Sequence, residues 1–393
     1  MSKLPSLAAA AWLREPALQR LFAVLAAAGG EGRVAGGAVR NALLGEDVTE
    51  IDVATTLSPD AVTAACVAAG MAVHPTGFDH GTVTVVAGHH PFEVTTLRHD
   101  LETDGRRARV AFTGDWAADA RRRDFTMNAL YCDARGTVHD FVNGWPDVEA
   151  RRVIFVGDAE QRIAEDCLRI LRFFRFHARY GHGAPDAAGL DACTRLRSGL
   201  DHLSAERIRQ EMFKLMAAPG AAETLRLMAA RGILARLLPY TEDWGVLERL
   251  PPDPLLRLAV LARDPLSMPG RWRLSNHEAR RLEAVVSLIP PTPALRPAEQ
   301  RIILYQTGAA AWRDLVHIAW ARSGAAADGA RWRDLLELPD RWPIPSLPVA
   351  GKDLVASGMS PGPEIGAMLR KLEDWWVASD FQPGRDELLK RLT

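Results

Sequence analysis

Two carboxylates, Glu50 and Asp52, follow a glycine pair at Gly36 and Gly37 in the stretch GGAVRNALLGEDVTEIDVATT. Glycines let a backbone approach an anion closely, and the N–H groups at the start of a following helix point toward it. If the chain returns as a strand at Glu50, the alternation of side chains places both carboxylates on one face. Divalent cations bound by such carboxylates could neutralise charge during phosphoryl or nucleotidyl transfer.

Two more residues could belong to this site. Arg40 lies one turn into the predicted helix and would add a fixed cation beside the glycine turn. Glu93 shares a predicted strand face with Thr95, and a third carboxylate on a neighbouring strand would complete a metal site. A solvent-exposed face is the ordinary place for such acids, so these assignments depend on motifs further along the chain.

The segment RRRDFTMNAL, residues 121–130, combines charged residues with core-forming ones. Arg123, Asp124 and Asn128 lie there among apolar side chains that pull the segment toward the core. Polar groups at a core boundary usually have a ligand or a hydrogen-bond network that satisfies them. We expect these three residues to have one or the other.

A helix is predicted in EQRIAEDCLRILRFFRFHAR, residues 160–179, from apolar residues at helical spacing. Asp166 and Arg169 lie three residues apart and hence on one helical face, with Arg172 one turn further. An intrahelical ion pair is the ordinary interpretation of the first two. Strand patterns nearly vanish from residue 149 onward, so the rest of the chain is predicted to be helical.

An α/β arrangement in the first part of the chain must position the residues of the site. Helices are predicted at residues 38–44 and 59–69. Strands are predicted at residues 33–35, 50–54, 71–74, 82–86 and 92–97. The charged stretch 98–113 shows no periodicity and is predicted to be a mobile loop beside the site. The α/β part is expected to end near residue 146.

Composition limits the class of protein. The 393 residues carry a net charge of −1 and are 48% hydrophobic, which is typical of a globular protein with more than one domain. The four cysteines are widely spaced and form no CxxC pair, which argues against structural zinc and a disulfide framework. No apolar run approaches the roughly 20 residues of a membrane span, so we expect a cytoplasmic protein without a membrane partner.

Five motifs taken together resemble one family. They are GGAVRNALLG…EID, FEVTTLR, RRDFTMNALY, RIAEDCLRILRFFRF and SAERIRQE, and they lie in this order between residues 33 and 215. Their order and spacing are similar to those of the class II tRNA nucleotidyltransferases, which comprise CCA-adding enzymes, CC-adding and A-adding relatives and bacterial poly(A) polymerases. The C-terminal part matches more loosely, through RLSNHEARRL and the SGMSPGPEIG segment.

The resemblance implies an α/β head like that of polymerase beta, followed by an all-α neck, body and tail that hold the tRNA acceptor arm. We place the head at residues 1–146, the neck at 147–217, the body at 218–298 and the tail at 299–393. The implied activity is template-independent addition of C, C and A to the 3′ end of tRNA from CTP and ATP, with release of pyrophosphate. Two Mg²⁺ ions would serve as cofactors, and the oligomeric state stays open.

By the same resemblance, the catalytic and metal-binding acids are Glu50 and Asp52. The strand pattern, not the resemblance, adds Glu93 as an expected third metal ligand. Glu206 and Arg207 match a motif that supports the neck. The nucleotide-binding residues fall into three groups. The triphosphate-binding turn has Gly36, Gly37 and Arg40, and the ribose-recognition segment has Arg123, Asp124 and Asn128. The base-reading pair is Asp166 and Arg169, with Arg172 beside it.

Hydrogen-bond chemistry supports the base-reading pair independently. Cytosine and adenine both present an amine donor beside a ring-nitrogen acceptor, whereas uracil and guanine present the reverse pattern. The Asp166 carboxylate can accept from the amine, and the Arg169 guanidinium can donate to the ring nitrogen. A mismatch leaves buried groups unpaired and costs about 1–3 kcal/mol per group, so C and A can be selected without a template.

The sequence departs from the family at two positions. The family usually has aspartate where Glu50 stands, and often where Asn41 stands. Glutamate can still reach a metal with looser geometry, although Mg²⁺ is strict about octahedral placement.

The alternatives to a CCA-adding enzyme are an A-adding enzyme or poly(A) polymerase of the same family, or a non-catalytic RNA-binding protein on this fold. The stretch 98–113 favours full CCA addition, because the family associates A addition with such a loop.

Overall fold

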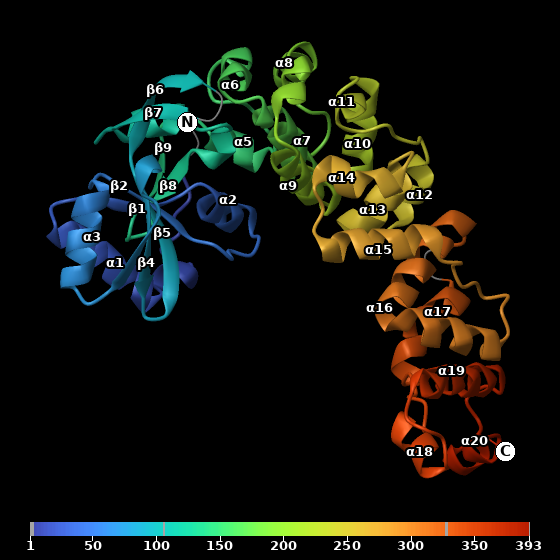
Figure 1. Ribbon diagram of the computed structural model, residues 1–393. Helices are drawn as coiled ribbons and strands as arrows, with labels where there is room; N and C mark the ends of the chain where they lie inside the picture. Colours follow the sequence, from blue (N-terminus) through green and yellow to red (C-terminus); the bar gives the residue numbers. More distant parts are fainter. Residues whose placement is uncertain (1–3, 105–106, 327–328, 393) are drawn as a thin grey trace. The chain divides into compact units, whose positions relative to one another are not determined.

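The computed structural model describes residues 4–104, 107–326 and 329–392. The chain divides into two compact units, one ending at Leu238 and the other beginning at Pro239 (Figure 1). No helix within the described ranges is long and apolar enough to cross a membrane. All the predicted site residues lie in the first unit, which also contains every strand of the described chain.

The first unit begins with a seven-stranded mixed sheet. Its strands are β1 (Gly32–Ala35), β2 (Asp52–Thr55), β3 (Ala72–Gly77), β4 (Thr82–Ala87), β5 (His90–Thr96), β8 (Leu130–Cys132) and β9 (Val138–Asp140). Their order across the sheet is β3-β4-β5-β2-β1-β8-β9. β2 and β5 run parallel, and all other neighbouring pairs run antiparallel. The parallel pair brings two distant segments of the chain side by side.

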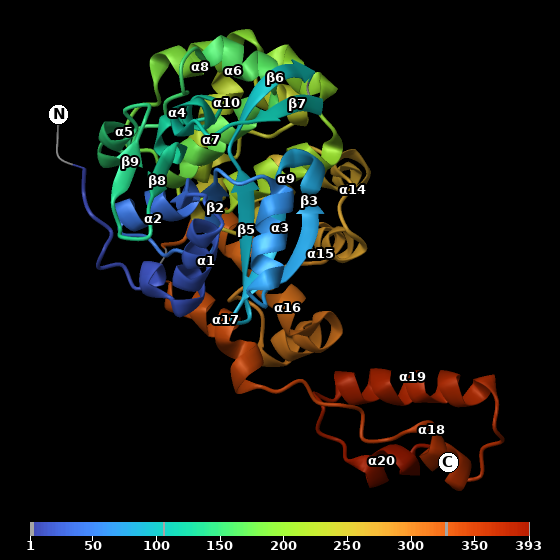
Figure 2. The ribbon, with the colours of Figure 1, turned by 90° about the vertical axis from the view of Figure 1, so that its left-hand side faces the viewer.

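Two helices cover one face of this sheet. α1 (Pro16–Ala27) and α3 (Pro59–Ala68) both contact β4 and lie together on one side of the strands (Figure 2). Val83, Val85 and Ala87 of β4 are buried, whereas the residues between them are only half-buried. This period-two alternation is the pattern of a strand with one covered face. The opposite face is therefore available for polar side chains.

Short helices surround the glycine turn. They are α2 (Gly37–Leu44), α4 (Trp116–Arg121), the 3-10 helix η3 (Thr126–Asn128) and α5 (Trp145–Glu149). α2 contacts β1, β8, η3 and α5. The segment 121–130 therefore lies directly beside the turn, as a shared site requires.

The stretch 98–113 forms a hairpin instead of the predicted loop. β6 (Arg98–Asp104) pairs antiparallel with β7 (Arg107–Phe112), and residues 105 and 106 lie outside the described ranges. The prediction of a structureless loop was wrong because the high charge obscured a short alternation of arginines with small and apolar residues in β7.

Helices make up the rest of the first unit. They are α6 (Ala159–Glu165), α7 (Leu168–Tyr180), α8 (Ala187–Arg195), the 3-10 helix η4 (Arg197–His202), α9 (Ala205–Met216), α10 (Ala221–Ala230) and α11 (Leu234–Leu237). The single helix predicted over residues 160–179 is in fact two helices, because Asp166 has extended backbone with φ −155° and ψ 104°.

An aromatic core joins the segment 121–130 to α7. The ring of Phe125 lies 4.9 Å from that of Phe155 and 5.2 Å from that of Phe176, measured between centroids. Phe173 completes the group, stacked on Phe155 at 5.5 Å. Aromatic pairs at these separations add to the stability that burial alone provides. The head and the neck helices therefore share one core.

The second unit is helical throughout its described residues. Its helices are α12 (Trp244–Arg249), α13 (Pro254–Leu261), the 3-10 helix η5 (Pro265–Ser267), α14 (Met268–Trp272), α15 (Asn276–Ser287), α16 (Pro297–Ser323), α17 (Ala330–Arg341), α18 (Gly351–Ala356), α19 (Pro363–Ala378) and α20 (Arg385–Lys390). One apolar core surrounds Trp312 and Trp332, and another surrounds Trp376. The predicted architecture, an α/β head followed by an all-α remainder, is confirmed.

Candidate functional site

The glycine turn has a backbone that only glycine adopts easily. Gly36 lies between β1 and α2 with φ 66° and ψ −113°, a conformation that side chains with a Cβ rarely reach. A Cβ there would lie 3.1 Å from Arg123 Nη1 and 3.3 Å from the Asn128 carbonyl oxygen. α2 starts at Gly37 without a side-chain cap, so the N–H groups of its first turn have no helical partner and suit an anion.

Three carboxylates gather at the middle of the sheet. Asp52 and Glu93 lie opposite each other on the parallel strands β2 and β5. Glu50 precedes β2, so the strand begins two residues later than predicted. Burial raises the pKa of Asp52, and the negative charges of Glu93 and Glu50 raise it further. Glu93 and Glu50 are therefore both close enough to Asp52 for their charges to act on its carboxylate.

These acids suit a divalent cation by donor type and by charge. Carboxylate oxygens are preferred ligands of Mg²⁺, and a cation would relieve the repulsion that raises the pKa of Asp52. Among the residues that the structure describes, no group of three or more His, Cys, Asp or Glu side chains is arranged to hold a metal ion. The carboxylates of Glu50, Asp52 and Glu93 thus fit a divalent cation by their chemistry.

Arg40, which the sequence predicts as a fixed cation beside the glycine turn, contacts protein groups in the structure, and its role toward a triphosphate stays a prediction. It is 6% exposed, and its Nη1 donates to Asn128 Oδ1. Its Nη2 donates to Asn41 Oδ1 at 2.8 Å and to the Tyr180 hydroxyl at 2.7 Å. Burial lowers the pKa of Arg40, and these acceptors satisfy its donors. Arg40 therefore anchors α2 to α7, because the helix packs this side chain inward.

Asp124 is the centre of a buried network. Its Oδ2 accepts from Arg172 Nε at 2.7 Å and from Arg172 Nη2 at 2.5 Å, and its Oδ1 accepts from Asn128 Nδ2 at 3.0 Å. Arg172 Nη1 also lies 3.9 Å from Glu211 Oε1 on α9. Burial alone would raise the pKa of Asp124, but Arg172 and the hydrogen bonds outweigh it and lower the pKa. Through Asn128 the network reaches Arg40, so it joins α2 to α7 and α9.

Arg123 belongs to a second cluster beside the glycine turn. Its Nε donates to the Tyr131 hydroxyl at 3.0 Å, and its Nη2 lies 3.2 Å from the buried carboxylate of Asp119. Although burial acts in the opposite direction, these contacts raise the pKa of Arg123 and lower that of Asp119. Arg123, Asp124 and Asn128 are thus satisfied by networks, one of the two outcomes expected for this segment.

The side chains of Asp166 and Arg169 have different partners. Asp166 Oδ2 accepts from Arg207 Nη2 at 2.7 Å, and its Oδ1 accepts from the Leu168 amide at 3.1 Å. Arg169 Nη1 donates to Glu165 Oε2 at 2.6 Å. Because the chain leaves the helix at Asp166, Asp166 and Arg169 do not form the intrahelical ion pair that their spacing suggested. Asp166 instead binds Arg207, and Arg169 binds Glu165.

Several of these partners were not predicted from the sequence. Asp119 and Glu165 each lie four residues before the arginine that they bind, so helical spacing was an available signal. Tyr180 lies 140 residues from Arg40 in the sequence, and no local sequence pattern predicts that contact.

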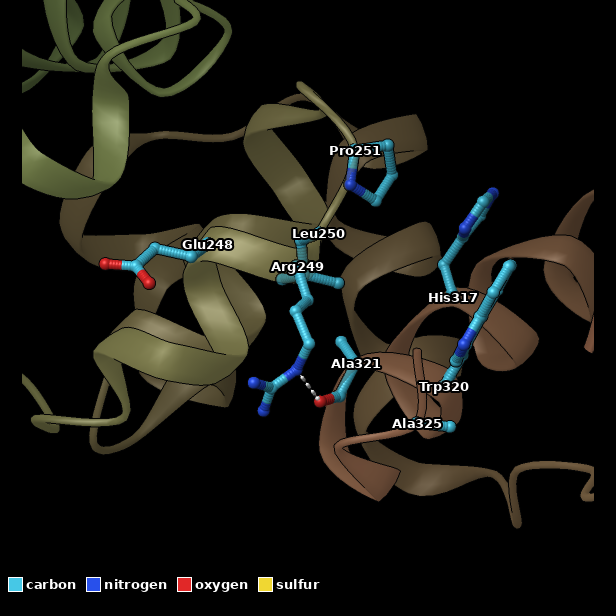
Figure 3. A pocket seen from close by; sticks show the side chains of 8 residues that line it. All are labelled: Glu248, Arg249, Leu250, Pro251, His317, Trp320, Ala321 and Ala325. Carbon is cyan, nitrogen blue, oxygen red and sulfur yellow. Dashed lines mark hydrogen bonds between the residues drawn. The ribbon is translucent and has the colours of Figure 1, made fainter. Parts of the chain in front are cut away.

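A separate cavity of about 390 Å³ lies in the second unit (Figure 3). Pro251 lies on one side of it, with His317 and Trp320 of α16 on the other. Beside it, Arg249 Nε donates to the Ala321 carbonyl oxygen at 2.7 Å. None of the predicted site residues lines this cavity, so it is distinct from the chemistry described above.

Comparison with known proteins gives family-model matches to two segments of the chain and relatives that match most of its length. Residues 32–154 match the family model described as Poly A polymerase head domain, and residues 186–244 match the probable RNA and SrmB-binding site of polymerase A. The chain is 34% identical over 382 residues to CCA tRNA nucleotidyltransferase 1, mitochondrial, of Danio rerio, which covers 92% of this chain and 86% of the relative. It is 29% identical over 392 residues to the CCA-adding enzyme of Leuconostoc mesenteroides, with 95% and 94% covered.

Solved structures resemble the chain over its length. The Bacillus stearothermophilus CCA-adding enzyme in complex with CTP superposes with a TM-score of 0.78 at 28% identity, covering 93% of each chain. The Thermotoga maritima CCA-adding enzyme complexed with tRNA has the same fold, with a TM-score of 0.62 at 17% identity over 95% of this chain and 93% of the other.

The Asp124–Arg172 pair predicts an acid-dependent stability. Because the pKa of Asp124 lies below its ordinary value of 3.8, the pair stabilises the protein above that pH and loses its effect as the pH falls toward the folded-state pKa. We expect Asp124→Asn to lower the free energy of unfolding by about 3 kcal/mol near neutral pH. The difference from wild type should shrink below pH 3.8.

Urea unfolding followed by tryptophan fluorescence across this pH range measures the effect. Asp60→Asn, on the exposed start of α3, is the matched control and should change little at any pH. A difference for Asp124→Asn that stays constant as the pH falls would show that the carboxylate charge does not stabilise the fold.

Proposed function

The chain belongs to the class II tRNA nucleotidyltransferase family, and on this premise we propose that it is a CCA-adding enzyme. It adds C, C and A to the 3′ end of tRNA from CTP and ATP, without a template, and releases pyrophosphate. The observation that carries this conclusion is the similarity to a CCA-adding relative over 92% of the chain, which spans both the acids of the sheet and the neck helices.

We propose that Glu50, Asp52 and Glu93 hold two Mg²⁺ ions. When bound, the metal would neutralise charge on the triphosphate and favour ionisation of the attacking 3′-hydroxyl. Support comes from the charges of Glu93 and Glu50, which raise the pKa of Asp52 beyond the effect of burial. The N-terminal turn of α2, entered through Gly36, would hold the triphosphate by its backbone N–H groups.

We propose that Asp166 and Arg169 read the incoming base. Arg207 holds the Asp166 carboxylate at 2.7 Å, and Glu165 holds the Arg169 guanidinium at 2.6 Å, so each is oriented by a partner of its own. A carboxylate has about four acceptor sites and a guanidinium five donors, so both keep capacity for a base. Cytosine and adenine then fit the two groups, and uracil and guanine leave them unpaired.

We propose that the helices after residue 146 hold the tRNA acceptor arm. The match of residues 186–244 to an RNA-binding family model supports this assignment. We also propose a cytoplasmic location from the composition, although the Danio rerio relative is named as mitochondrial. Cell fractionation that finds the protein in an organelle would correct the location without changing the activity.

Removal of Asp52 tests the reaction. We expect Asp52→Ala to lower incorporation of CMP and AMP by about 1,000-fold or more, since a carboxylate that holds the metal is lost. Incorporation is measured with CTP, ATP, Mg²⁺ and a tRNA that ends at the discriminator base. Asp60→Ala, an exposed acid on α3, is the control and should retain activity.

Product length in the same assay separates the alternatives. The wild-type protein should extend the tRNA by three nucleotides, CCA. A single added A or a long A tail would reassign the protein within its family. Binding of tRNA without any turnover would make it a non-catalytic RNA-binding protein.

Base reading is tested by replacing its carboxylate. We expect Asp166→Ala to lower kcat/KM for CTP about 10- to 100-fold, because the amine of cytosine loses its acceptor. The ratio of CTP to UTP incorporation should fall as well. Asp191→Ala on α8, an acid with a 54% exposed side chain and likewise paired with an arginine, should change neither quantity. Asp166 has no part in selection if the ratio of its variant equals that of wild type.

A further inference from the structure

A basic pocket of about 330 Å³ lies on α7 and α9, outside the residues to which the proposed function gives a role. Arg175 and Arg179 of α7 and Lys214 of α9 line it. The rings of Phe176 and Tyr180 form part of its wall. Three cations around one hollow are an arrangement suited to an anion.

The cations of this pocket are only partly neutralised. Arg175 Nε lies 2.7 Å from Glu211 Oε2, and Arg179 Nη2 lies 3.2 Å from Glu46 Oε2. The side chain of Lys214 is exposed and makes no hydrogen bond or ion pair within the described part of the chain. One wall of the pocket therefore carries a cation without a counter-charge.

Both carboxylates near the pocket are shared with further arginines. Glu211 also lies 3.9 Å from Arg172, whose main partner is Asp124, and Glu46 also lies 3.6 Å from Arg151. Five arginine and lysine side chains thus face three carboxylates around this end of α7. The excess of positive charge would be reduced by a bound anion.

The position of the pocket separates it from the triphosphate-binding turn. Glu46, the partner of Arg179, follows the C-terminal end of α2, whereas Gly36 precedes its N-terminal end. A helix of eight residues rises about 12 Å, so the two places are separate. Tyr180 nevertheless accepts a hydrogen bond from Arg40 at 2.7 Å, so the pocket borders the same junction of head and neck.

We propose that this pocket binds a backbone phosphate of the RNA substrate. The guanidinium groups of arginine and the ammonium group of lysine commonly bind the phosphates of nucleic acids. Such contacts fix the position of the nucleic acid without reading its sequence. The inference rests on the proposed function, because the tRNA supplies the phosphate. In this role Lys214 positions the tRNA and takes no part in the chemistry.

The test measures tRNA binding by the full-length protein, by fluorescence anisotropy, without nucleotides and over a range of salt concentrations. We expect Lys214→Ala to weaken binding roughly three- to tenfold and to reduce the slope of log Kd against log salt by about 1, as loss of one phosphate contact does. Lys214→Arg should leave both the Kd for tRNA and the salt slope unchanged. Arg135→Ala, which removes an exposed arginine of the head, is the control and should also keep them.

A separate titration with CTP distinguishes an RNA phosphate from a nucleotide phosphate. CTP affinity should be equal in wild type and Lys214→Ala. A loss of CTP affinity with unchanged tRNA binding would overturn the proposal, and so would unchanged tRNA affinity and salt slope. If wild type extends tRNA while Lys214→Ala binds it normally, only the pocket is refuted. If wild type neither binds nor extends tRNA, the proposed function fails as well.

Discussion

The ion pair between Asp124 and Arg172 is the contact on which the arrangement of the site depends. It joins the segment after α4 to the helix α7 by two hydrogen bonds of 2.5 and 2.7 Å. Removal of one partner from a buried pair leaves an uncompensated charge and costs about 3–5 kcal/mol, so the two groups must stay together. Together with the aromatic core around Phe125 and the Arg40–Tyr180 hydrogen bond, this pair fixes α7 to the α/β part of the chain.

The geometry of the site extends from this contact in both directions. On the head side, Asn128 connects Asp124 to Arg40 of α2, the helix that begins at the glycine turn. On the neck side, Arg172 follows Arg169 by three residues on the same helix, so its position sets that of the base-reading group. In the proposed mechanism, one nucleotide is held by its phosphates at the glycine turn and read by its base at Asp166 and Arg169. These side chains would then select C and A without a template.

The sequence predicted the elements of the site better than the contacts between them. The turn at Gly36 and the strands that carry Asp52 and Glu93 followed from glycine chemistry and from strand patterns, which are local signals. The adjacency of Asp52 and Glu93 depends on the pairing of two strands that are distant in the chain. The break at Asp166 did not follow from local signals, because apolar spacing continues through it and only the backbone leaves the helix. The contact of Arg40 with Tyr180 spans 140 residues and depends on how α2 packs against α7, which no local pattern encodes. The place of Arg40 beside the glycine turn was predicted, whereas its contact with Tyr180 was not.

The most direct measurement of the central claim is the ratio of kcat/KM for CTP to that for UTP in Arg172→Gln, compared with wild type on the same tRNA. Arg172 bonds to Asp124 and lies one turn from Arg169, so its loss removes the buried ion pair that positions the helix proposed to read the base. The account predicts that the ratio falls by at least about tenfold, since discrimination requires both groups to be held in place. An unchanged ratio, with the rates for both nucleotides lowered equally, would contradict it.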